Sequence, residues 1–143
     1  MPQMIFINLP VTDLPRATAF YEKIGATKNE MFCDDTASCM VFSDTIFAML
    51  LTHEKFSQFT SKKIIDAKTS SEVLLALSAD SRAAVDALVN RASKAGGGSD
   101  PCPRQDYGFM YGRSFEDPDG HIWEVMWMDL EAAAKAQPAA ADA

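Results

Sequence analysis

The order of features in the chain repeats. Twice, an apolar run typical of a β-strand leads into a polar residue suited to cap a helix, and a helix-like segment that ends at glycine follows. When Asp13 is aligned with Asp80, the letters NLPVTD lie over LALSAD and the two helix-like segments coincide. Such a repeat indicates a duplicated unit, although few residues are identical between the halves. The fold is thereby limited to two similar halves that share one core.

The first half is predicted to contain one strand, one helix and three further strands. Residues 4–11 are apolar and favour a strand, and Asp13 suits the N-cap of a helix over 14–25 that stops at Gly25. Three short strands are expected at 26–33, 37–42 and 46–51, separated by residues with turn chemistry.

The second half repeats this order. Its expected elements are a strand at 72–79, a helix at 82–96 and closing strands at 109–116 and 121–128. The prolines in 99–108 confine any strand there to the edge of a sheet. The sequence therefore predicts an α+β fold built from two tandem βαβββ modules.

These elements fit one domain over residues 1–128, with modules at about 4–53 and 72–128. A polar crossover at 54–71, long for a connection, joins the modules over the surface. The alanine-rich tail, residues 129–143, is expected to be either a short helix or disordered.

Composition excludes several classes of function. No apolar run approaches the ~20 residues that a membrane span needs, and the N-terminus lacks the features of a signal peptide, so a cytoplasmic protein is expected. A formal net charge of -7, with scattered basic residues, argues against a nucleic-acid partner. The three cysteines include no CxxC pair and indicate neither a zinc ribbon nor a disulfide framework. A small molecule is the expected partner.

The stretch 113-RSFEDPDGHIWEVMW-127 holds the clearest candidate for a functional residue, Glu124. Alternate side chains of a strand share a face, so Glu124 lies with Met126, while Trp123 and Trp127 face the other way. We expect the tryptophan face to pack under a helix and the face of Glu124 to line a cavity.

The segments 8-NLPVTDLPRATAFYEKIGA-26 and 112-GRSFEDPDGHIWEVMW-127, in a duplicated βαβββ chain, resemble the vicinal oxygen chelate superfamily. This superfamily includes glyoxalase I, extradiol dioxygenases, fosfomycin-resistance enzymes and bleomycin-resistance proteins. The resemblance covers nearly the whole globular chain. It implies an open, curled mixed sheet whose concave face holds the site, and it implies a homodimer.

The resemblance also locates four metal-ligand positions, on the first and last strands of each half. The first-strand positions fall on Phe6 and Leu74, and Asn8 is the only polar side chain in the first strand. The last strand of the first half, 46–51, is wholly apolar, so Glu124 alone matches the family's ligands. One carboxylate cannot compensate a divalent ion for its lost water. We therefore expect no cofactor, with a divalent metal held in an unconventional way as the alternative.

Two interpretations of Glu124 stay open. It is either an inherited carboxylate that is solvated or neutralised by Arg113, or a group that accepts a hydrogen bond from a ligand or acts as a general base. The ligand-binding residues expected around a mostly apolar ligand are Asn8, Phe6, Leu74, Arg113 and Met126.

The two histidines are weaker candidates. His121 follows the DPDG turn and is expected at the surface, pointing away from the face of Glu124. His53 and Glu54 do not form an HExxH zinc motif, because residue 57 is Ser, and a solvated loop is their expected setting.

Two functions fit these features best, and a purely structural interaction module, which would leave the concave face unused, fits them less well. The first is a metal-free small-molecule-binding protein similar to glyoxalase and bleomycin-resistance proteins. The alternative is an enzyme of the same superfamily, either a lactoylglutathione lyase-like isomerase or an extradiol dioxygenase, in which a metal polarises vicinal oxygens. The sequence does not decide whether the chain is an enzyme.

Overall fold

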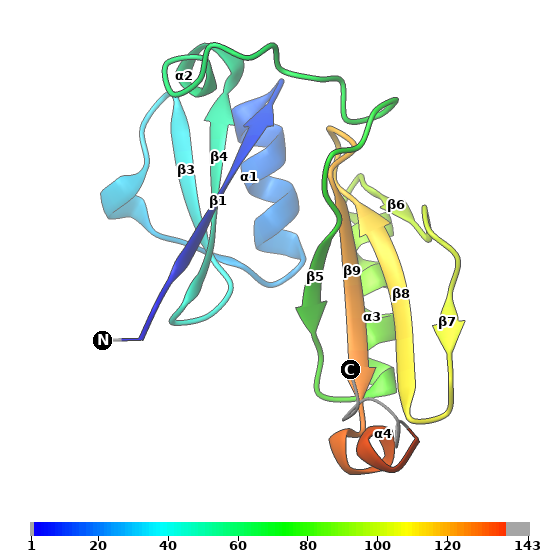
Figure 1. The fold of residues 1–143 in the computed structure, drawn as a ribbon. Coiled ribbons are helices and arrows are strands. Elements are labelled where there is room, and N and C mark those ends of the chain that lie inside the picture. Colours follow the sequence, from blue (N-terminus) through cyan, green and yellow to red (C-terminus); the bar gives the residue numbers. More distant parts are fainter. Residues whose placement is uncertain (1, 137–143) are drawn as a thin grey trace.

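The computed structural model describes residues 2–136 (Figure 1). The first half contains β1 (Ile5–Val11), α1 (Leu14–Lys23), β2 (Thr27–Lys28), the 3-10 helix η1 (Glu30–Phe32), β3 (Ala37–Val41), β4 (Ile46–Thr52) and α2 (His53–Phe56). The second half contains β5 (Leu75–Ser78), α3 (Arg82–Lys94), β6 (Gly98–Ser99), β7 (Gln105–Asp106), β8 (Met110–Glu116), β9 (Ile122–Met128) and α4 (Leu130–Ala136). Each half starts with a strand and a helix, as the repeated order of the sequence predicts.

The strands form two open mixed sheets. The first has the order β1-β4-β3-β2, with β1 parallel to β4. The second has the order β5-β9-β8-β6, with β5 parallel to β9 and with β7 as a further short partner of β8. The predicted α+β class is confirmed. The expectation that prolines confine any strand in 99–108 to the edge of a sheet is confirmed as well, because β7 pairs with β8 alone.

Local signals in the sequence determine where the two long helices begin and end. Oδ1 of Asp13 accepts a 3.0 Å hydrogen bond from the backbone N–H of Arg16, so Asp13 is the N-cap of α1. Gly25 follows with φ +113, a conformation that favours glycine because side chains are strained there. Ser81 caps α3 in the same way, through a 3.0 Å bond from the N–H of Ala84.

The structure departs from the predicted strand at 26–33. Only Thr27 and Lys28 pair with β3, and the chain then turns into η1. The cause is local, because the side chain of Asn29 accepts a hydrogen bond from the N–H of Met31 and caps this turn. At the other end of the chain, α4 forms part of the predicted tail, and residues 137–143 lie outside the described part.

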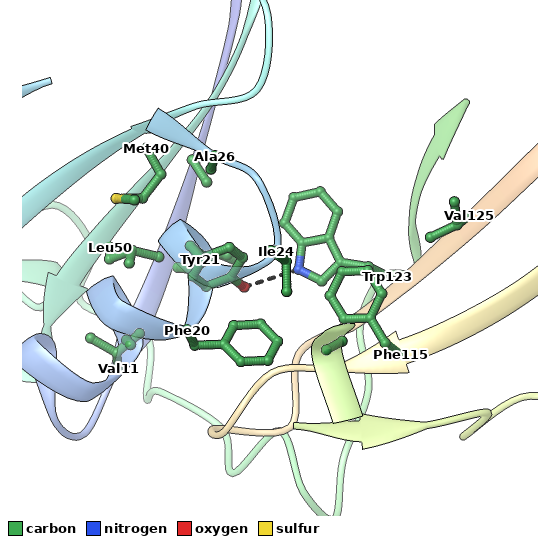
Figure 2. Packing of buried hydrophobic residues seen from close by; sticks show 14 of the residues in the cluster. Val11, Phe20, Tyr21, Ile24, Ala26, Met40, Leu50, Phe115, Trp123 and Val125 are labelled. Carbon is green, nitrogen blue, oxygen red and sulfur yellow. Dashed lines mark hydrogen bonds between the residues drawn. The ribbon is translucent and has the colours of Figure 1, made fainter. Parts of the chain in front are cut away.

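One apolar core joins the two halves. It contains the helix-facing residues of both sheets together with residues of α1 and α3. Phe20 and Tyr21 of α1 lie against Phe115 and Trp123 of the second sheet (Figure 2). Trp123 is fully buried, as predicted for the tryptophan face of β9. Because the helix-facing sides share this core, the other side of each sheet is turned outward.

Within residues 2–136, no helix combines the length and the apolarity that crossing a membrane would require.

Candidate functional site

A cavity of about 400 Å³ lies where the end of β1, the start of β9 and the chain between α2 and β5 meet. We call it the crossover cavity. Its walls include Asn8, Pro10, Phe56, Lys62, Lys63, Ile64, Ile65, Ser70, Glu72, Val73, His121 and Ile122. This cavity could not be predicted from the sequence, because the crossover has the composition of an ordinary polar connection. Its volume is within the range of small-molecule sites, roughly 300–1,000 Å³.

Gly120, in the DPDG turn before β9, allows the crossover to approach this closely. It has φ +97, and a Cβ built on it would lie 2.6 Å from the backbone nitrogen of Lys68. A side chain of any size would therefore push the crossover away from the turn. This contact holds one wall of the cavity against the second module.

The carboxylates of the same turn bind the first module. Asp117 Oδ2 accepts a 2.7 Å hydrogen bond from the hydroxyl of Tyr21, and Asp119 Oδ1 accepts bonds from the backbone N–H and the hydroxyl of Thr12, at 2.9 and 2.8 Å. Burial raises the pKa of the Asp117 carboxyl above its ordinary value, and it raises the pKa of Tyr21 as well. The DPDG turn thus fixes the end of β1 relative to the start of β9.

His121 lies in the wall of the cavity and is half-buried, which corrects its expected setting as a surface turn residue. Its Nε2 lies 2.8 Å from the carbonyl oxygen of Pro10. A carbonyl only accepts, so Nε2 carries a proton and donates, and in the neutral form of the ring Nδ1 would be an acceptor. Nδ1 has no hydrogen-bond partner among residues 2–136. A long-range contact of this kind leaves no trace in the sequence around His121.

A second cavity of about 360 Å³ shares His121 and Pro10 with the crossover cavity. It is more polar, and Thr12, His53, Asp66, Lys68 and Asp119 belong to its walls. Oδ2 of Asp119 is buried without a hydrogen-bond partner in the described part of the chain. His53 and Glu54 begin the short helix α2 and are exposed.

Glu124 lies on the outward side of the second sheet, and neither cavity includes it. In register, it is flanked by Ala76 of β5 and Ser114 of β8. Met126 shares this side of the sheet by the alternation of side chains along β9, and the exposed Leu74 directly precedes β5. The predicted site residues Glu124 and Met126 therefore share one face of the sheet, and neither cavity includes them or Leu74.

The first sheet presents the other predicted residues. Phe6 is 50% exposed on the outward side and stacks on Phe47, with 4.7 Å between ring centroids. Asn8 lies two residues along the same strand, on the same side, and reaches the crossover cavity. Asn8 is thus the one predicted ligand-binding residue that is a member of that cavity wall.

Arg113 is not the partner of Glu124, and this expectation is wrong. Arg113 is opposite Val125 in the register of β8 and β9, so its side chain points to the helix side, where it is buried. It donates to both oxygens of Asp100, at 3.0 and 2.7 Å, and to Asp86 at 3.0 Å. Hydrogen bonds from Arg113 hold the pKa of Asp100 below its ordinary value.

The residues of this chain do not fit the divalent metal that related proteins often hold. Within residues 2–136, no three His, Cys, Asp or Glu side chains come together in a way that could bind a metal ion. Around Glu124 the neighbouring side chains are an alanine, a serine and apolar residues, which offer no further strong ligand.

The sequence and the fold, rather than the site, place the chain in a large superfamily. The sequence matches the Glyoxalase/Bleomycin resistance protein/Dioxygenase superfamily over residues 3–125, and the chain belongs to it. No curated protein matches the sequence.

Solved structures show the same fold. A hypothetical protein from S. aureus is similar with a TM-score of 0.73 and 24% identity, over 89% of this chain and 94% of the other. A family enzyme from Burkholderia phytofirmans PsJN has a TM-score of 0.70 and 21% identity, over 89% and 99%. The fosfomycin resistance protein FosX from Mesorhizobium loti has a TM-score of 0.66 and 18% identity, over 93% and 98%. At these identities the similarity establishes the fold alone.

Proposed function

We propose that this chain is a cytoplasmic, metal-free small-molecule-binding protein of the superfamily, and that its ligand occupies the crossover cavity. One observation carries the proposal. The described residues enclose a cavity of about 400 Å³ between the two modules, whereas the positions where related proteins hold metal carry Phe6 and Leu74. The chain therefore has a cavity that can hold a small molecule, but it lacks the side chains that would coordinate a metal ion.

The composition of the cavity wall supports this function. Small-molecule sites are mostly apolar and contain a few polar groups that orient the ligand. Asn8 and His121 are such groups, since the side-chain amide of Asn8 and Nδ1 of His121 have no hydrogen-bond partner among the described residues. Both lie on strands or turns fixed by the core, so they hold their positions before a ligand arrives.

The competing function is a metal-dependent lyase or dioxygenase that uses Glu124. Such an enzyme would need at least two more ligands close to Glu124, from a source other than its neighbours in the second sheet. The first experiment is therefore calorimetric titration of Mn²⁺, Zn²⁺, Ni²⁺ and Fe²⁺ into the natively purified protein and into Glu124→Ala. We expect no tight stoichiometric binding by either protein. Tight binding that Glu124→Ala abolishes would overturn the metal-free assignment.

A second experiment tests the cavity itself. Val73 lines the crossover cavity and is 57% exposed, so Val73→Trp can reduce the free volume without overpacking the core. We expect Val73→Trp to weaken binding of apolar fluorescent probes, with the melting temperature little changed. Equal binding by wild type and variant would remove the crossover cavity as the ligand site.

We also propose that the protein works as a homodimer. The outward sides of the sheets carry exposed apolar residues, with Phe6 at 50% and Leu74 at 51% exposure. One chain does not bring these sides together, because the helix-facing sides already share the core. A second copy carries the same apolar surfaces, so association through the outward sides of the sheets would cover these surfaces together with Glu124.

A further inference from the structure

We infer that the ligand of the crossover cavity is an amphipathic anion, with an apolar body and one carboxylate or phosphate group. The inference rests on the proposed function and extends it from a cavity to a class of ligand. The apolar and charged side chains of the cavity wall are distributed as such a ligand requires.

The apolar part of the wall sets the body of the ligand. Phe56, Ile64, Val73 and Ile122 come from α2, the crossover and the start of β9, so apolar surface lines the cavity on more than one side. A ligand that occupied this space with polar groups would lose hydrogen bonds to water without replacement. An aliphatic or aromatic body matches the wall.

The charged part of the wall sets the head group. Lys62 and Lys63 both line the cavity, and Glu72 is the only acidic residue among its lining residues. Neither lysine lies within 4.0 Å of a carboxylate oxygen in the described part of the chain. The cavity wall is therefore positive by one charge in a protein whose net charge is -7.

The positive charge of the cavity wall, in a protein of negative net charge, affects which ligands the cavity attracts. A chain with an excess of acidic residues repels anions over most of its surface, so an anion gains attraction only where cations gather. Two lysines without a carboxylate partner supply six N–H donors on flexible stems, which suits a carboxylate or phosphate at the mouth of a cavity. A cationic ligand would find only Glu72 and would be repelled by both lysines.

Two dyes with the same aromatic body test the inference. Anilinonaphthalene sulfonate carries an anionic group that stands in for carboxylate or phosphate, and phenylnaphthylamine lacks it. We expect the anionic dye to bind at least about tenfold more tightly at low salt, which corresponds to one hydrogen bond with a charged group. The Lys62→Ala/Lys63→Ala variant should lose this preference while it still binds the neutral dye.

A control variant of equal net charge separates the effect of the two lysines in the cavity wall from the effect of the protein's total charge. Lys23 and Lys94 are exposed in the last turns of α1 and α3 and lie outside the cavity wall. Lys23→Ala/Lys94→Ala removes the same two charges and should keep the preference for the anionic dye. Val73→Trp should weaken binding of both dyes, because it reduces the cavity.

The outcomes distinguish the inference from the proposed function. If the neutral dye binds and Val73→Trp weakens it, but the anionic dye is not preferred, the anion inference is overturned and the cavity stands. The anion inference is also overturned if Lys62→Ala/Lys63→Ala and Lys23→Ala/Lys94→Ala reduce the preference for the anionic dye equally. If neither dye binds, or Val73→Trp has no effect on either, the proposed site and the inference both fail.

Discussion

The hydroxyl group of Tyr21 donates a 2.7 Å hydrogen bond to Oδ2 of Asp117 and accepts a 3.0 Å hydrogen bond from Nε1 of Trp123. Tyr21 belongs to α1 in the first module, whereas Asp117 and Trp123 belong to the second module. The bond to Trp123 is drawn in Figure 2. A single buried hydroxyl thus connects the two halves and holds the DPDG turn at the edge of the crossover cavity.

Tyr21→Phe should lower the free energy of unfolding by at least about 2 kcal/mol. The substitution keeps the ring in the core but leaves the indole N–H of Trp123 and one oxygen of Asp117 buried without a partner, and each such loss costs roughly 1–3 kcal/mol. Urea unfolding followed by tryptophan fluorescence measures the change. Tyr107→Phe is the control, because Tyr107 is exposed. Equal stability of the two variants would mean that the buried hydroxyl does not connect the halves energetically.

Gly120→Ala should destabilise the protein more than Gly108→Ala. Both glycines have positive φ, +97 and +80, so each alanine costs about 1–2 kcal/mol in backbone strain. Only at Gly120 would the new Cβ also meet the backbone of Ala67 and Lys68, whereas nothing lies within 4 Å at Gly108. The additional loss at Gly120 measures the contact that closes the cavity.

Limited proteolysis complements this measurement. We expect Gly120→Ala to be cleaved faster than wild type within the crossover, because the crossover can no longer rest on the turn. Gly108→Ala should be cleaved there at the wild-type rate. Identical cleavage of the two variants would show that the crossover is held by other contacts.

The ion pair of Arg82 and Asp106 predicts a pH dependence of stability. Two hydrogen bonds from Arg82, at 3.0 and 2.7 Å, lower the pKa of Asp106 from its ordinary 3.8 to about 2. Between these values the unfolded chain binds a proton that the folded chain does not, so this contribution to stability is lost as pH falls through the window. Asp106→Asn should therefore lose less stability than wild type between pH 4 and pH 2, in urea titrations at each pH.

Asp44→Asn is the control for this titration. Asp44 is exposed in the turn between β3 and β4 and forms no ion pair within residues 2–136. Its variant should follow the wild-type pH dependence. If the stability of Asp106→Asn falls with pH as steeply as that of wild type, solvent screens the pair of Arg82 and Asp106, as it does for many exposed ion pairs.

The parts of the fold that could be predicted from the sequence are those that depend on residues close together in the chain. Asp13 and Gly25 mark the ends of α1 because a cap and a left-handed turn act within a few residues. The alternation around Trp123 predicted which side of β9 is buried, because strand geometry alone decides it. Asn29 shows the limit of such signals, since its short-range cap replaced most of a predicted strand by a turn.

The site was less predictable because its contacts join distant segments. His121 was expected at the surface, and its position depends on the carbonyl of Pro10, which is 111 residues away. Arg113 was expected near Glu124, but strand register placed it on the opposite side, with Asp100 and Asp86. A cavity formed by the crossover and two strand ends requires their relative positions, and no single stretch encodes these.

The outward side of the first sheet gives the last prediction, which concerns assembly. If two chains associate through this side, Phe6 and its stacked neighbour Phe47 are covered in the dimer. Phe6→Asp would then bury a charge without a partner and weaken association at least tenfold, or about 1.4 kcal/mol. Light scattering coupled to size exclusion should report a dimer for wild type and a monomer for Phe6→Asp at the same concentration.

The control for this experiment is Phe59→Asp. Phe59 is 67% exposed and lies after α2, outside the sheets, so its substitution adds the same charge to a different surface. We expect that variant to remain dimeric and both variants to keep the circular dichroism of wild type. A monomeric wild type, or a dimeric Phe6→Asp, would mean that the exposed phenylalanine surface is not where two copies meet. Glu124 would then stay open to solvent in the working protein.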